Sequence, residues 1–210
     1  MGSTGLILFD AGGNLDPSFN AGSGPEQGYL VNEVDVIVRQ PDGKILIGGD
    51  FKQFSGAPAR LLTRLKADGS IDTSFHGDLG VEGGDWPAVK AIVVQPDGSV
   101  LVGGRFTSAT GLPRFGVARL LADGSVDPSF NPDWIAGGQI FSLGLQQDGR
   151  IIVGGGFFVS GGGEQIGVAR LLPDGSRDGS FDAVTGGDGG VSCFAIQIQP
   201  DDKIDRKSNV

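Results

Sequence analysis

The stretch VIVRQPDGKILIGGDF at residues 36–51 decides the fold, because closely similar stretches recur along the chain. Two close counterparts and one partial counterpart follow it: IVVQPDGSVLVGGRF at 92–106, LGLQQDGRIIVGGGF at 143–157 and AIQIQPDDKI at 195–204. The turn aspartate recurs after 55, 51 and 53 residues, at Asp42, Asp97, Asp148 and Asp201. A period of this length is typical of a repeat protein in which each unit is one supersecondary structure.

A second block follows each of the three complete copies. It reads RLKADGSIDTSF at 64–75, RLLADGSVDPSF at 119–130 and RLLPDGSRDGSF at 170–181. A related block, LFDAGGNLDPSF at 8–19, precedes the first complete copy. The sequence therefore divides into complete units and two half units: complete units at about 31–75, 88–130 and 139–181, and partial units at 5–19 and 191–204.

Each unit is predicted to form four short antiparallel strands, a to d. Strand b is an unbroken β-branched and leucine run such as Ile45–Ile47, which predicts burial on both faces. The Gly-Gly pair after it permits close backbone approach. An Asp-Gly turn joins a to b and another joins c to d. We expect one all-β domain over 1–210, a β-propeller of four-stranded antiparallel blades with three complete blades plus one composite or incomplete blade.

The pairing of QPDGKILIGGDF with RLKADGSIDTSF resembles the delta-60 repeat, a family that forms propellers in bacterial proteins. The resemblance implies a non-catalytic binding or scaffold role in large surface-associated or secreted bacterial and phage proteins. It names no ligand and no catalytic residue. An extracellular, cell-surface or virion setting is implied, although the start MGSTGLILFDAGG lacks the pattern of a signal peptide.

The fourth unit departs from the pattern, because DRKSNV at 205–210 replaces the expected apolar run. We expect strand b of that unit to be interrupted. Residues 5–19 could supply strands c and d, and residues 191–204 could supply strand a and a stub of strand b, so the two half units could form a composite fourth blade within one chain. Alternatively, two chains share their broken blades as a homodimer or a larger homo-oligomer, which the interrupted strand favours.

Composition limits the partners. The chain has 210 residues, 39 of them glycine, with a formal net charge of −9 and a pI of about 4.5. Acidic charge repels polyphosphate, so no nucleic-acid partner is expected. No stretch reaches the ~18 apolar residues of a membrane span, so no membrane insertion is expected. A single cysteine, Cys193, permits no internal disulfide.

Side chains that recur in every unit are predicted to serve the blade itself. The turn aspartates Asp42, Asp97 and Asp148 suit tight turns. The arginines of strand c are expected to form ion pairs with the aspartates of strand d or with the adjacent blade. The phenylalanines that close each unit are also expected to have a structural role. These residues are Arg64, Arg119 and Arg170; Asp72, Asp127 and Asp178; and Phe75, Phe130 and Phe181.

The loops that vary between units are the candidate binding face for a protein or glycan. Two tryptophans there directly follow aspartates, and an aromatic face beside a carboxylate suits a sugar or a cationic side chain. The candidate ligand-binding residues are Trp86, Trp134, Asp85, Asp133 and Arg114. The favoured alternative is that both tryptophan rings fill gaps between neighbouring blades.

Signals for catalysis and cofactors are weak. His76 is the single histidine, and Cys193 has apolar neighbours typical of a buried residue. Loop carboxylates could bind Ca²⁺, but no D-x-D-x-D-G loop is present, so no cofactor or metal is expected. These carboxylates are Asp78, Glu82, Asp85, Asp133, Asp182 and Asp188. The chain is predicted not to be an enzyme. The leading prediction is a binding or scaffold module that contacts a protein or glycan through its loop face. The first alternative is a building block that assembles through its blade edges, and the second is a glycan hydrolase.

Overall fold

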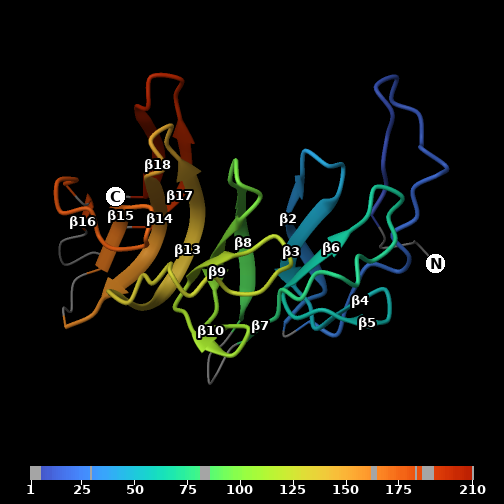
Figure 1. Cartoon of the computed structure of the whole chain (residues 1–210), viewed down its shortest axis with the longest axis horizontal. Coiled ribbons are helices and arrows are strands. Elements are labelled where there is room, and N and C mark those ends of the chain that lie inside the picture. Colours follow the sequence, from blue (N-terminus) through green and yellow to red (C-terminus); the bar gives the residue numbers. More distant parts are fainter. Residues whose placement is uncertain are drawn as a thin grey trace.

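The computed structural model describes residues 6–28, 30–80, 86–161, 165–182, 184–185 and 192–209, with the side chains of 184–185 and 206–209 outside the description. All regular elements in these ranges are β-strands (Figure 1). No helix of the described chain is long and apolar enough to cross a membrane.

Each complete repeat forms one antiparallel sheet with strand b at its centre. Repeat 1 has the order β2-β3-β6, and repeat 2 has the order β8-β9-β12. Their bounds are Glu33–Arg39, Ile45–Asp50 and Leu62–Leu65, then Ala88–Val94, Val100–Arg105 and Val117–Leu120. Repeat 3 contains β13 (Ile135–Leu145), β14 (Ile151–Val159), β15 (Gln165–Leu171) and β16 (Val184–Thr185), and is followed by a hairpin of β17 (Ser192–Ile198) and β18 (Ile204–Asn209).

Strand d is shorter than the sequence pattern predicts. It is a single bridge in each repeat: Leu65 with Ile71, Leu120 with Val126 and Leu171 with Arg177. In repeat 1, Asp72 ends the strand because its carboxylate accepts hydrogen bonds from the N–H (3.1 Å) and hydroxyl (2.6 Å) of Ser74. This local turn diverts the chain from strand c after one residue. Among the described residues, repeats 1 and 2 therefore have three-stranded sheets, and repeat 3 has a fourth strand, β16.

Several connections that the sequence pattern assigns to loops contain short strands. They form two further three-stranded sheets, β1-β4-β5 and β11-β10-β7. The bounds are Pro25–Glu26, Gln53–Phe54 and Ala57–Pro58 for the first, and Leu112–Pro113, Ser108–Ala109 and Leu79–Gly80 for the second. Each small sheet joins the b–c connection of a repeat to the segment before that repeat, so these variable connections are ordered parts of the fold.

The expectation that strand b of the fourth unit is interrupted is wrong. β18 pairs with β17 over its whole length. Ile204 lies opposite Ile198 at one end of the pairing, and Asn209 lies opposite Ser192 at the other. Alternation explains how charged residues are accommodated, because successive residues of a strand face opposite sides. Ile204 packs against repeat 3, whereas Asp205 is exposed to solvent.

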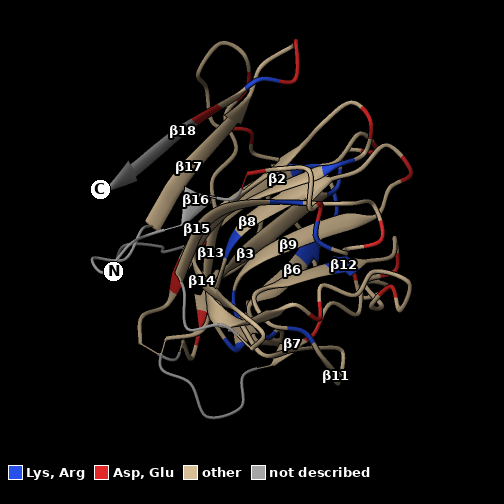
Figure 2. Ribbon diagram, turned by 90° about the vertical axis from the view of Figure 1, so that its left-hand side faces the viewer, with Lys and Arg blue, Asp and Glu red and all other residues tan. Residues whose placement is uncertain are grey.

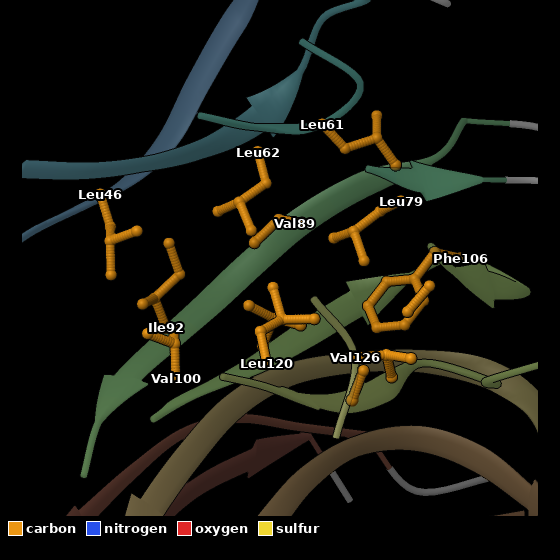
Figure 3. Packing of buried hydrophobic residues seen from close by; sticks show 13 residues of the cluster. Leu46, Leu61, Leu62, Leu79, Val89, Ile92, Val100, Phe106, Leu120 and Val126 are labelled. Atoms are coloured by element: carbon orange, nitrogen blue, oxygen red, sulfur yellow. The ribbon is translucent and has the colours of Figure 1, made fainter. Parts of the chain in front are cut away.

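The hydrophobic core lies between successive sheets. Figure 3 shows the cluster between repeats 1 and 2, in which Leu46 and Leu62 lie near Val89 and Val100. Similar clusters join repeat 2 to repeat 3 and repeat 3 to the β17–β18 hairpin. Strand β3 is buried along its whole length, which confirms the prediction that strand b is buried on both faces.

The stacked sheets form an open row. Figure 1 shows the segment 6–19 at one end of the long axis, and repeat 3 with the β17–β18 hairpin toward the other end. Within 6–19 the bridge is local, between Phe9 and Leu15, and among the described residues no strand pairing joins this segment to β17 or β18. The composite blade within one chain, one of the two alternatives from the sequence, is therefore absent from the described residues. Many acidic residues lie in turns and connections (Figure 2).

The Gly-Gly pair allows this stacking. A Cβ on Gly48 would lie 2.5 Å from Cγ1 of Val89 in the next repeat, and a Cβ on Gly49 would lie 2.0 Å from the carbonyl oxygen of Glu33. The first glycine therefore admits the neighbouring sheet, and the second admits strand a beside its bulge at Val34 and Val36. The other two pairs are equally confined. A Cβ on Gly103 would lie 2.9 Å from Ile140 and one on Gly154 2.5 Å from Ile196, both in the next unit, and Cβ atoms on Gly104 and Gly155 would each lie 2.1 Å from a carbonyl oxygen of strand a.

We predict that Gly48→Ala destabilises the chain by about 1–3 kcal/mol through overpacking against Val89, although alanine is normally favoured over glycine in a strand. Gly179→Ala is the matched control, because a Cβ at Gly179 meets nothing within 4 Å, and its effect should stay within ~0.5 kcal/mol. Urea unfolding of both variants measures the difference. Equal stabilities would contradict the account of sheet stacking.

Candidate functional site

Each repeat contains the same ion pair between strand c and the residue after strand d. The Nε atom of the arginine donates to the aspartate Oδ2 over 2.8 Å in Arg64–Asp72, 2.7 Å in Arg119–Asp127 and 2.8 Å in Arg170–Asp178. The pair in repeat 1 is almost fully buried, with side-chain exposures of 5% and 6%. A buried ion pair is tolerated where further hydrogen bonds satisfy both partners, and these further bonds are present.

The same guanidinium groups lie over the closing phenylalanines. The distance from the guanidinium carbon to the ring centroid is 4.6 Å for Arg64 and Phe75, and 4.9 Å for both Arg119 with Phe130 and Arg170 with Phe181. This distance is within the range of cation–π attraction. Arginine, aspartate and phenylalanine thus form one packed group in every repeat, which we call the arginine clamp.

The arginine clamp also contacts the next repeat. Nη1 of Arg64 donates to the carbonyl oxygen of Ala122, and Nη1 of Arg119 donates to that of Pro173, both over 2.6 Å. One side chain therefore ties strand c to its own aspartate and to the following repeat. The planar guanidinium group can bind both acceptors at once because its N–H donors point in several fixed directions.

The clamp aspartates have lowered pKa values. Hydrogen bonds from the hydroxyl and N–H of Ser180, together with Arg170, lower the pKa of Asp178 to about 2. Burial acts to raise the pKa of Asp72, but hydrogen bonds from Ser74 and the charge of Arg64 outweigh burial and lower it. Both carboxylates are therefore ionised near neutral pH and are poor general acids.

The turn aspartates make local contacts. Asp42 accepts from the N–H of Lys44 (3.1 Å), Asp97 from that of Ser99 (2.9 Å) and Asp148 from that of Arg150 (3.0 Å). Each bond spans two residues and holds the a–b turn.

The two tryptophans lie in different environments, and no ring contact joins them. Trp134 packs edge-on against Phe157 with 6.1 Å between ring centroids, and its indole N–H donates to the carbonyl of Gly175 over 3.1 Å. Arg177 lies over the same ring. Trp86 is 61% exposed and lines a cavity of about 200 Å³ beside Leu30 and Lys90.

Arg114 and Asp133 line one cavity of about 290 Å³, together with Phe115 and Asn131. Arg114 is 8% exposed, and its Nη1 donates to the carbonyl of Pro113. Its buried Nε has no hydrogen-bond partner, and no carboxylate in the described part of the chain forms an ion pair with Arg114. A buried cation without a counterion is costly, so Arg114 is a candidate contact for an anionic group in this cavity. A ligand role for these residues stays a prediction.

The other candidate residues are dispersed. Asp85, Glu82 and Asp188 lie outside the described residues. His76, Asp78 and Asp182 are exposed, and Cys193 is buried. Within the described ranges, no group of three or more His, Cys, Asp or Glu side chains could hold a metal ion.

The segment 6–19 has an exposed apolar surface that the repeat pattern did not predict. Ile7, Phe9 and Leu15 are 61%, 58% and 62% exposed. Alignment of LFDAGGNLDPSF with the second block places Phe9 at the position of Leu65, which is fully buried. The alignment also puts Leu8 where the other units have the clamp arginine, so the available signal was a half unit with apolar residues and no clamp.

These features define an all-β repeat protein of the propeller type. The family model described as "Domain of unknown function (DUF5122) beta-propeller" matches residues 40–75, 95–130 and 146–181. The chain therefore belongs to the DUF5122 β-propeller family. A comparison with curated proteins finds no match.

We predict that Asp178→Asn lowers stability at pH 6 and that the difference from the parent protein narrows as the pH falls from about 5 to 2. The folded pKa of about 2 is below the unfolded value of ~3.9, so the charged carboxylate stabilises the fold above the unfolded pKa. That contribution is lost as the pH falls through the folded pKa. Urea unfolding followed by tryptophan fluorescence measures it, with Asp133→Asn at an exposed position as control. A difference that stays constant over this pH range would contradict the assignment.

Proposed function

We propose that the chain is a non-catalytic scaffold module that assembles through its open ends. The observation that carries this proposal is the exposed apolar face of residues 6–19. Phe9 is exposed at a position that is fully buried in every internal repeat, and exposed neighbouring apolar side chains of this kind mark an interaction surface. In this proposal the chain contributes three complete propeller blades and one incomplete blade.

The internal repeats support this reading of the exposed face. The residues aligned with Phe9 are Leu65, Leu120 and Leu171, and all three are fully buried. Val126, aligned with Leu15, is 9% exposed. Leu120 and Val126 lie in the cluster between repeats 1 and 2, and Leu171 lies in the cluster between repeats 2 and 3. Leu65 lies in a cluster to which Leu6 and Phe19 contribute. Burial of Phe9 and Leu15 to the same extent would remove apolar surface worth about 1.5–3 kcal/mol for each side chain.

The net charge shapes this assembly. Copies that each carry −9 repel one another at long range, and salt screens this repulsion over about 10 Å at 0.1 M. Contact must therefore come from short-range apolar packing and hydrogen bonds. Association is expected to strengthen with ionic strength.

Binding of a protein or glycan through the loop face is the second candidate function. The partnerless Nε of Arg114 in its cavity with Asp133 favours an anionic group there. We also propose that the repeats are of the delta-60 type, and that the setting is extracellular, on a cell surface or in a virion. Support for these finer assignments comes from the sequence resemblance.

We predict that light scattering over a ~100-fold concentration range gives a mass of at least twice 21.5 kDa at the upper end, with more of the larger species at high salt. A stable monomer at every concentration and salt level would contradict assembly. It would leave the loop face with Arg114 as the better candidate.

A further inference from the structure

Three junctions between neighbouring units use the same backbone hydrogen bond. The residue after each closing phenylalanine donates its N–H to the carbonyl of the turn residue in the next unit. The bonds are Asn20 to Asp68 (2.9 Å), His76 to Asp123 (2.8 Å) and Asn131 to Asp174 (2.9 Å). The junction is therefore a repeated docking contact between a donor segment and a c–d turn.

A glycine in the c–d turn makes room for the donor segment. A Cβ on Gly69 would lie 2.6 Å from the backbone of Asn20, and a Cβ on Gly124 would lie 2.6 Å from the backbone of Gly77. At Gly175 the distance to the backbone N of Asn131 is 3.0 Å. A side chain at this position would block the contact.

The segment 8–19 contains a turn that corresponds to the c–d turn of the internal junctions, and no described donor segment lies against it. Gly13 aligns with Gly69 and has the same backbone conformation, with φ of +80°, but a Cβ there would meet nothing within 4 Å. Ala11 and Gly12 align with Ala122 and Asp123, whose carbonyls accept the clamp arginine and the backbone N–H at an internal junction.

Repeat 3 has the groups that donate at an internal junction, namely the clamp arginine and the N–H after the closing phenylalanine. We call these groups the donor half, and in repeat 3 no described c–d turn accepts from them. Arg170 contacts Asp178 and Phe181 as the other clamp arginines contact their partners. Among the described residues, however, its Nη1 has no carbonyl acceptor, in contrast to Arg64 and Arg119. The N–H of Asp182, which follows Phe181 as His76 follows Phe75, likewise has no backbone acceptor in the described part of the chain.

We propose that the donor half of repeat 3 binds residues 6–19 of a second copy of the chain; this inference rests on the proposed scaffold function. Nη1 of Arg170 donates to the carbonyl of Ala11, and the N–H of Asp182 donates to that of Gly12. Phe9 packs beside Phe181. The edge of β18 that is not paired with β17 lies where the other sheets have strand c, so residues 6–9 of the second copy take that place.

The contact is head-to-tail and joins different surfaces of the two copies. The two halves lie at opposite ends of the row of sheets, which is why a second copy supplies the partner (Figure 1). A contact of this kind closes into a ring when its rotation permits and otherwise continues as a filament.

The test uses Gly13→Asn, since asparagine tolerates the left-handed conformation but places a side chain in the contact. Dimerisation should weaken at least ~10-fold. Gly98→Asn is the matched control, because Gly98 has φ of +85° and nothing within 4 Å of a Cβ. Thermal unfolding of both variants verifies that the fold is retained. Equal weakening by the two variants would contradict the proposal.

Arg170→Lys tests the opposite surface, because lysine keeps the charge near Asp178 but has one nitrogen, whereas arginine uses Nε for the aspartate and the separate Nη1 for a carbonyl in the next unit. It should also weaken association, and mixing Gly13→Asn with Arg170→Lys chains should restore a dimer through the one junction that remains intact. Normal association of both single variants would overturn the head-to-tail contact while leaving the scaffold function standing. A parent chain that stays monomeric would overturn both.

Discussion

The close stacking of one small sheet on the next is the constraint on which the structure depends. Each sheet has too few strands to bury a core by itself, so its apolar side chains must be covered by the neighbouring repeat. The first glycine of each Gly-Gly pair sets how closely two sheets approach, as Gly48 does against Val89. The arginine clamp then fixes the junction, since Arg64 reaches both Asp72 and the carbonyl of Ala122.

In the described residues the row of sheets is open, because no strand pairing joins the segment 6–19 to β17 or β18. At one end, Phe9 is exposed at a position that is fully buried in each complete repeat, and its bridge partner Leu15 is exposed as well. At the other, Arg170 repeats the intrarepeat half of the clamp without its carbonyl acceptor among the described residues. The ends are complementary, because one displays a c–d turn and the other displays the groups that dock on such a turn. Asp205, exposed where Leu46 is buried, makes the outer face of β18 more polar than its counterparts.

The repeat pattern predicted the strand positions a to c well, because buried strand b and the Asp-Gly turns follow from local sequence. It predicted strand d less well, since side-chain hydrogen bonds of Asp72 to Ser74 end that strand after one bridge. The pattern also predicted that β18 would be interrupted, because charged residues replace its apolar run. A strand with one exposed face accepts charged residues at alternate positions, so the strand forms. The arrangement of Arg114 with Asp133 and the separation of Trp86 from Trp134 depend on how loops of different repeats meet, which no local pattern encodes.

The most direct measurement is disulfide crosslinking between two single-cysteine chains, Gly12→Cys and Asp182→Cys, each in a Cys193→Ala background. The account predicts an intermolecular disulfide when the two chains are mixed and oxidised, because the backbone of residue 182 lies against the turn at residue 12 of the second copy. Neither chain should crosslink with itself. A mixture without the mixed disulfide, or efficient crosslinking of Gly12→Cys chains to each other, would contradict the head-to-tail junction.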